Sequence, residues 1–202
     1  MKRVWMLVLL SLVLAACSAG EKATEAGPAK VEESDKPADE GLQKGDKVVK
    51  ETDNSRVVEN DGYLEYQGTK WEQETFGLKT DVYSVSLLED MATNYPNFAD
   101  DLQGIPCVMI GVGLNNQNDQ PVTADFMDAT LVGESGKQLD IDLAFSEYLQ
   151  EEMKPNTNKD GMVLFRLPEG TDIKTVKKMT LYFKVTDANG ETKEVEAPIT
   201  LS

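Results

Sequence analysis

Side-chain oxygens are the groups in this sequence that could do chemistry, and they gather in one short segment. Asn115, Asn116, Asn118 and Asp119 fall within five residues of one another. Calcium takes about six to eight oxygen ligands from carboxylates, amides and carbonyls, and it needs no histidine. These four residues are therefore the candidate binding residues, with calcium as the candidate cation. The segment lacks the Asp-x-Asp-x-Asp-Gly spacing of an EF-hand, so a solvated polar loop is the alternative interpretation.

The sequence lacks residues that common catalytic sites require. The 202 residues include no histidine and two cysteines, which excludes His-ligated zinc and Ser-His or Cys-His couples. Neighbouring carboxylates do not show the separation across a cleft that glycoside hydrolysis needs. These pairs are Glu89-Asp90, Asp100-Asp101, Asp140/Asp142 and Glu151-Glu152. We expect no catalytic residue, no cofactor, no enzymatic activity and, apart from the calcium candidate, no metal.

Net charge limits the partners. The chain carries a formal charge of −16 and has a pI of about 4.4, so binding to nucleic acid through phosphate neutralisation is not expected. Residues 61–202 hold 25 acidic and 11 basic groups. Such a domain favours cations or cationic partners. The alternative is that the acidity only keeps an exported protein soluble.

The first sixteen residues have the layout of a signal peptide. Lys2 and Arg3 precede an apolar run from Val4 to Ala16. Thirteen helical residues span about 20 Å, which is short of the roughly 30 Å hydrocarbon core of a bilayer. A secretory signal peptide over residues 1–16 is therefore favoured over a transmembrane helix.

The run ends in Leu14-Ala15-Ala16-Cys17, which resembles a bacterial lipobox. The resemblance implies that the Cys17 thiol receives a diacylglycerol, that the chain is cut before Cys17, and that the new amine is acylated, for example with palmitate. Two or more acyl chains anchor a protein stably, whereas one does not. The implied location is the extracytoplasmic face of the cell membrane, with the bilayer as a partner through Cys17. An ordinary signal peptide followed by a chance cysteine is the alternative.

Composition divides the remaining chain in two. Residues 17–60 contain no aromatic residue and few large aliphatic ones, so they cannot bury enough apolar area to offset the entropy of ordering. We interpret them as the lipidated cysteine followed by a disordered linker, with a short transient helix as the alternative. The folded domain is expected over residues 61–202. Cys107 lies in an apolar run without basic neighbours, which indicates a buried and unreactive thiol.

Alternating apolar and polar residues predict that the domain is all-β. In 176–186, Met179, Leu181, Phe183 and Val185 are expected to point inward, and Asn189-Gly190 supplies a hairpin turn. In 78–87, Tyr83, Val85 and Leu87 are expected to face the core. Further strands are predicted at 105–115, 122–126, 129–132, 138–141, 161–167 and 191–201. The spacing of Phe145, Tyr148 and Leu149 predicts one short helix over 144–153. Seven or eight short strands indicate an antiparallel β-sandwich, with a barrel as the alternative.

Six stretches of this domain resemble a family of immunoglobulin-like, telokin-like extracellular domains of unknown function found in lipoproteins of Gram-positive bacteria. They are Val108–Asn116, Gln120–Val122, Leu131–Lys137, Met153–Pro155, Gly161–Pro168 and Met179–Phe183. Asn156 follows Pro155 where that family has glycine, so the loop departs from its pattern. The resemblance implies an immunoglobulin-like sandwich at the cell surface and implies no activity.

Four aromatic residues before the first of these stretches offer a last candidate feature. Tyr63, Tyr66, Trp71 and Phe76 could form a patch that stacks on a sugar or peptide, or a flap that covers the edge of the sandwich. Taken together, the sequence predicts a lipid-anchored surface lipoprotein that displays a non-catalytic immunoglobulin-like domain to a protein or peptide partner not named by the sequence. The alternative is an accessory ligand- or calcium-binding lipoprotein that serves a membrane complex.

Overall fold

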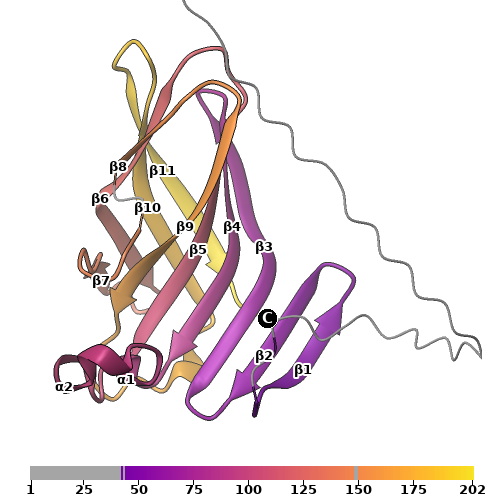
Figure 1. Ribbon diagram of the computed structural model, residues 1–202, viewed down its shortest axis with the longest axis vertical. Coiled ribbons are helices and arrows are strands. Elements are labelled where there is room, and N and C mark those ends of the chain that lie inside the picture. Colours follow the sequence, from indigo (N-terminus) through magenta and orange to yellow (C-terminus); the bar gives the residue numbers. More distant parts are fainter. Residues whose placement is uncertain (1–41, 43, 148–149) are drawn as a thin grey trace, which may run out of the picture. The chain divides into compact units, whose positions relative to one another are not determined.

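Eleven strands in two antiparallel sheets make up the part of the chain that the computed structural model describes, which is residues 42, 44–147 and 150–202. The first sheet has the order β1-β2-β3-β4-β5-β9. Its strands are β1 (Lys47–Thr52), β2 (Ser55–Asn60), β3 (Tyr63–Thr75), β4 (Leu78–Leu88), β5 (Cys107–Asn116) and β9 (Thr157–Arg166). Figure 1 shows this sheet as one layer in front of the strands β6, β10 and β11.

The second sheet has the order β11-β10-β6-β7, and β8 also pairs with β6. Its strands are β6 (Val122–Gly133), β7 (Gln138–Asp140), β8 (Gln150–Met153), β10 (Lys178–Thr186) and β11 (Thr192–Thr200). The prediction of an antiparallel β-sandwich is confirmed, and the chain forms two separate sheets rather than one closed barrel.

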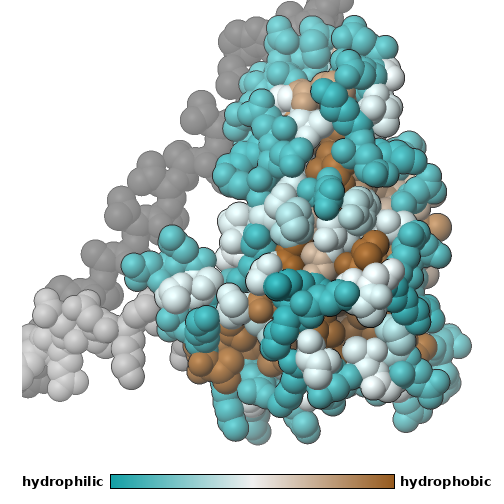
Figure 2. All heavy atoms as spheres, turned by 180° about the vertical axis from the view of Figure 1, so that it is seen from behind, coloured by the Kyte–Doolittle hydropathy of each residue, from teal (hydrophilic) through white to brown (hydrophobic). Residues whose placement is uncertain are grey.

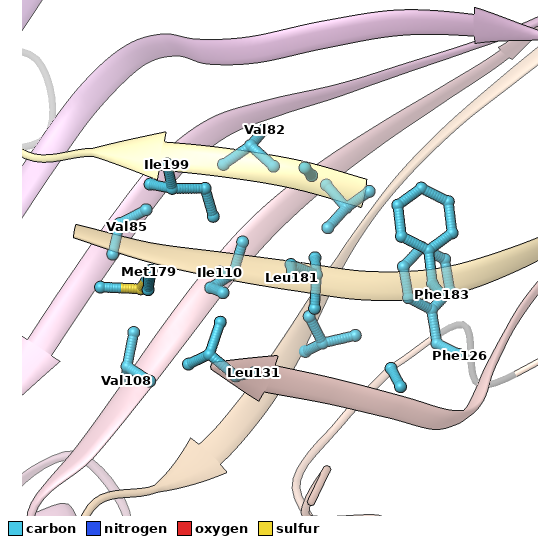
Figure 3. Packing of buried hydrophobic residues seen from close by; sticks show 14 of the residues in the cluster. Val82, Val85, Val108, Ile110, Phe126, Leu131, Met179, Leu181, Phe183 and Ile199 are labelled. Carbon is cyan, nitrogen blue, oxygen red and sulfur yellow. The ribbon is translucent and has the colours of Figure 1, made fainter. Parts of the chain in front are cut away.

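The core lies between the two sheets, where inward-facing residues stand in register. One row of the first sheet runs through Val57, Tyr66, Val85, Ile110 and Val163, each at most 5% exposed. In the second sheet Met179, Leu181, Phe183 and Val185 face this row, as the alternation predicts. Figure 3 shows how side chains from both sheets meet in this layer. A two-residue period puts every second side chain on one face, which is why the prediction for β10 succeeds.

A change of register in β4 corrects one predicted face. The pairing of β4 with β5 shifts between Val82 and Ser84, so Tyr83 is the extra residue of a β-bulge. A bulge reverses the alternation on either side of it. Val82, Val85 and Leu87 therefore all lie in the core, whereas Tyr83 points outward and is 37% exposed. The expectation that Tyr83 faces the core is wrong for this reason.

The helices lie elsewhere than predicted. The two short helices α1 (Met91–Asn94) and α2 (Ala99–Leu102), joined by the 3₁₀ turn η1 (Pro96–Phe98), occupy the connection between β4 and β5, and a second 3₁₀ turn, η2 (Ile173–Thr175), precedes β10. No helix forms over 144–153 among the described residues. The backbone N–H of Asp142 and of Glu147 instead donate to carbonyls of β9, and Gln150–Met153 is strand β8. The segment from 141 to 147 covers the outer edge of β9, and these bonds to β9 replace those of a helix.

The folded domain also begins earlier than residue 61. Strands β1 and β2 occupy Lys47–Asn60, a range that the composition assigns to the disordered linker. Strand β2 is paired on both sides, and its Val57 and Val58 are buried although they point to opposite faces. Every residue of β1 is exposed, which explains why the composition of this range resembles a solvated segment. The signal peptide, Cys17 and the linker up to residue 41 lie outside the described residues.

A second, smaller hydrophobic cluster lies on the outer face of the first sheet. It consists of Leu88, Met91, Leu102, Cys107 and Leu164, and the connection that carries α1 and α2 covers it. Asp90 closes this connection, because its Oδ1 accepts the backbone N–H of Ala92 at 2.9 Å and that of Gly104 at 3.1 Å. Within the described residues, no helix has the length and apolar character needed to span a bilayer.

Candidate functional site

The Asn115–Asp119 segment connects β5 to β6, and its central residue is a structural one. Asn116 is fully buried. Its Nδ2 donates to the backbone oxygens of Gln120 and Met153 at 2.9 Å and of Lys154 at 3.3 Å. Its Oδ1 accepts the N–H of Asn118 at 3.0 Å. Both Nδ2 and Oδ1 of Asn116 are thus hydrogen-bonded, and these bonds hold the β5–β6 connection against the end of β8.

The other three candidates in this segment do not converge with Asn116. Asn118 donates its side-chain amide to the carbonyl of Phe76, which holds the β3–β4 turn. Gly77 makes this contact feasible, because a Cβ at Gly77 would lie 2.2 Å from Asn118 atoms. Asn115 is exposed on the outer face of β5, and Asp119 lines a shallow hollow between loops. The structure places the four predicted binding residues in different contacts, and two of them are committed to the fold.

The paired carboxylates are separated by the fold as well. Asp142 Oδ2 accepts from Arg166 Nε at 2.5 Å, Asp90 caps α1, and Asp100 and Asp101 lie exposed in the first turn of α2. No group of three or more acidic or cysteine side chains that could hold a metal ion occurs within residues 44–147 and 150–202.

Cys107 is buried, as the sequence predicts, at the floor of the outer cluster. Burial raises the pKa of its thiol to about 12, and the nearby Asp142 carboxylate adds to the effect while Arg166 opposes it. A thiolate is the reactive form of cysteine. At neutral pH this side chain is therefore a small hydrophobic residue and no nucleophile.

The four aromatic residues form neither a common patch nor a flap. Tyr66 belongs to the core, and Tyr63 packs against the outer cluster. The Trp71 ring meets Phe183 edge-on with centroids 6.4 Å apart, which joins β3 to the second sheet. Lys193 Nζ lies 4.2 Å above the Phe76 ring.

Two glycines of β5 let neighbouring side chains lie flat on the outer face of the first sheet. A Cβ at Gly111 would lie 2.7 Å from the Tyr83 ring, and one at Gly113 would lie 2.5 Å from Asp81 Oδ1. Burial raises the pKa of Asp81, with Lys79 opposing and Asp160 reinforcing the shift. The space above these two glycines is therefore filled by the protein's own side chains.

An apolar cavity lies at the opposite end of the sandwich from the asparagine segment. β6 starts at that segment and ends at Gly133, where it turns into β7, while β10 starts beside that turn at Lys178. Here the β6–β7 turn and the connection from β9 to β10 leave a gap over the core. The gap has a volume of about 240 Å³, and we call it the end cavity. Its apolar floor is made by Leu131, Leu139, Leu167, Val176 and Met179.

Lysines gather at the mouth of the end cavity. Lys137 comes from the turn after β6, whereas Lys177 and Lys178 come from the start of β10, and all three are exposed. None of them forms an ion pair with another described residue. Glu134 is the one carboxylate among the described residues that line the cavity. No local motif marks this site, because its lysines lie about 40 residues apart and meet only in the folded chain.

Figure 2 shows the molecule from behind, with a mainly hydrophilic surface that hydrophobic residues interrupt in separate spots. On this face of the molecule the hydrophobic residues are interspersed with hydrophilic ones. The end cavity, which combines an apolar floor with a charged mouth, is typical of a small-molecule pocket.

Comparison with known proteins yields structural neighbours alone. No protein-family profile matches the chain, and no curated protein matches its sequence. A functionally unknown protein from Listeria monocytogenes EGD-e matches with a TM-score of 0.46 at 12% identity, over 68% of this chain and 85% of its own. A conserved hypothetical protein from Bacillus anthracis matches with 0.39 at 13%, over 66% and 97%. The yjhA protein from Bacillus subtilis matches with 0.43 at 11%, over 65% and 96%.

Proposed function

We propose that the protein is a lipoprotein anchored through Cys17 to the extracytoplasmic face of the cell membrane, where it displays a non-catalytic, immunoglobulin-like binding domain. The observation that carries the proposal is the sequence Leu14-Ala15-Ala16-Cys17 directly after a basic start and an apolar run of thirteen residues. Two or more acyl chains on Cys17 would hold the chain stably at the bilayer.

The binding role is supported by what the domain offers and by its composition. A chain without histidine lacks the usual general base, and its remaining thiol is buried with a raised pKa. The end cavity, by contrast, is a concave apolar site with charged groups at its mouth, which is the usual form of a ligand site. This cavity favours the form of the proposal in which the domain captures a ligand for a membrane complex. At the β5–β6 connection the Asn116 Oδ1 already accepts the backbone N–H of Asn118, so this oxygen is less available to calcium.

The experiment compares the full chain with the variants Cys17→Ser and Cys107→Ala. We expect the wild-type protein and Cys107→Ala to begin at residue 17, to carry the added mass of a diacylglycerol, and to enter the detergent phase on phase separation. Cys17→Ser should lose both the added mass and the detergent partitioning. Intact-mass spectrometry that finds a free Cys17 thiol, or a chain that still begins at Met1, overturns the anchor.

The calcium form has its own test. A ligand at about 100 times its Kd stabilises a protein by about 2.7 kcal/mol. Thermal unfolding of the same preparation with millimolar calcium and with a chelator should then differ by several degrees. Identical melting temperatures remove calcium from the proposal and leave the anchor untouched.

A further inference from the structure

We infer that the end cavity binds a small apolar carboxylate, a free acid of about the size of an aromatic ring with a two- or three-carbon arm. The inference rests on the proposed binding function and names the ligand class and the site. It is carried by the juxtaposition of an apolar cavity with three lysines at its mouth that form no ion pair with another described residue.

Size sets the apolar part of the ligand. A protein cavity of about 150 Å³ lined by aliphatic and aromatic side chains holds a benzene molecule. The end cavity measures about 240 Å³ and is floored by Leu131 and Met179, which belong to the core, together with the half-buried Leu139, Leu167 and Val176. This volume has room for a ring and a short chain.

Charge sets the polar part. The domain over residues 61–202 has 25 acidic groups against 11 basic ones, yet three of the basic ones stand at this one mouth with a single carboxylate, Glu134. At physiological ionic strength the Debye length is about 8 Å. Carboxylates farther away than this are therefore largely screened, and among the described residues that line the cavity Lys137, Lys177 and Lys178 outnumber the one carboxylate. An ammonium ligand of the same shape would meet like charges.

Two threonine hydroxyls at the cavity are already used as donors within the chain. Thr171 Oγ1 donates to the carbonyl of Pro168 at 2.6 Å, and Thr175 Oγ1 donates to that of Asp172 at 2.7 Å. These bonds shape the connection between β9 and β10. The lysine ammonium groups remain as donors for the ligand carboxylate, and charge-assisted hydrogen bonds of this kind are the stronger ones.

The test is a methyl NMR titration of the full-length lipoprotein, labelled on its methionine methyl groups and held in nanodiscs of neutral phosphatidylcholine. The probe is 3-phenylpropionate, and empty nanodiscs give the blank. Met179 reports on the cavity, whereas Met91 in the outer cluster is an internal control. From the usual free energy per ligand atom we expect a Kd of about 0.1–1 mM, with the Met179 signal moving and the Met91 signal fixed.

Variants test the lysines at the mouth and the apolar cavity separately. Combined Lys137→Gln, Lys177→Gln and Lys178→Gln should weaken binding about tenfold. Val176→Trp should abolish binding by filling the cavity, with an unchanged Met91 signal showing that the variant is folded. The matched control is Lys193→Gln, because Lys193 lies near the start of β11, at the end of that strand away from the cavity. This variant should bind the acid as the wild type does. The amine 3-phenylpropylammonium should bind at least about tenfold more weakly than the acid.

Three results overturn the inference. They are an immobile Met179 signal at about 10 mM acid, equal affinity for the amine and the acid, and unchanged affinity in the triple lysine variant. Tighter binding of an acetylated dipeptide that ends in phenylalanine also overturns it, because the site would then serve the carboxyl end of a peptide. Mass spectrometry of Cys17 in the same sample shows whether the anchor holds, so failure of the ligand and failure of the proposed function are distinguishable.

Discussion

Asn116 in β5 donates its side-chain amide to the backbone oxygen of Met153, at the end of β8, 37 residues further along the chain. This bond links the first sheet to the second through an amide that no solvent reaches. A buried polar group is stabilising when all its hydrogen bonds are made and costly when they are not. The segment Asn115–Asp119, which the sequence predicts to bind a ligand, therefore helps to hold the two sheets together.

Replacing Asn116 tests this role. Asn116→Ala leaves the carbonyls of Met153, Gln120 and Lys154 without their donor, and we expect a loss of about 2–3 kcal/mol in the free energy of unfolding. The neighbouring Asn115 is exposed and points outward, so Asn115→Ala should change stability by less than about 0.5 kcal/mol. Urea unfolding of the two variants measures the difference. Equal losses would show that Asn116 has no special role.

The aromatic stack at the centre of the core gives a second prediction. The rings of Phe126 and Phe183 are stacked with centroids 4.6 Å apart, and Phe126 is 1% exposed. Phe126→Ala should cost about 3–5 kcal/mol through lost contacts and the remaining cavity. Met127, the next residue, is 43% exposed in the bulge of β6. Met127→Ala is the matched control and should be nearly neutral in the same urea experiment.

Gly111 should not tolerate a side chain. The Cβ of Gly111→Ala would lie 2.4 Å from Ser84 Oγ and 2.7 Å from the Tyr83 ring, so one of these side chains must shift. We expect a loss of about 1–3 kcal/mol. No heavy atom lies within 4 Å of the corresponding Cβ position at Gly133, and Gly133→Ala should be tolerated. Thermal unfolding of both variants decides, and a stable Gly111→Ala would contradict the packing of Tyr83.

Cys107 makes stability depend on alkaline pH. Because its pKa is raised to about 12 in the folded chain by burial and lies near 8.5 in an unfolded one, the unfolded state releases its proton first. Ionisation of Cys107 thus leaves the free energy of unfolding unchanged below about pH 8.5. Between about pH 8.5 and 12 it lowers this free energy by at most about 1.4 kcal/mol per pH unit. Above that range the stability contributed by the protonated thiol is lost.

The variant Cys107→Ala isolates this contribution. Tyr63 also has a raised pKa through burial and adds its own loss above about pH 10, so the wild type and the variant must be compared over pH 8 to 10. In that range the stability of the wild type should decline and that of the variant should stay nearly level. Parallel curves would mean that the thiol is not shielded from water.

Much of the sandwich could be predicted because its interior strands follow simple alternation. β10 is buried on one face, so Met179 to Val185 reveal their orientation directly. The alternation of β4 fails at Tyr83, since the bulge depends on pairing with β5 and leaves no trace in the local pattern. The predicted helix fails because Phe145 packs against Tyr95 of a distant segment, with ring centroids 5.2 Å apart.

The site was less predictable than the fold for the same physical reason. Polar residues in a loop look alike whether they bind a ligand or a backbone, and the burial of Asn116 exists only after the sheets meet. The end cavity depends on Lys137 and Lys177 arriving from two separate connections. Because tertiary packing brings these lysines together, their spacing in the sequence does not predict the site.

The exposed strand β1 has a consequence for contacts between copies of this protein. A regular edge strand with unpaired backbone groups can pair with the same strand of another molecule. β1 carries Lys47 and Lys50, and its register slips between Val48 and Lys50. Charge and irregularity of this kind hinder pairing between edge strands, so we expect concentrated solutions of this protein to resist aggregation through β1.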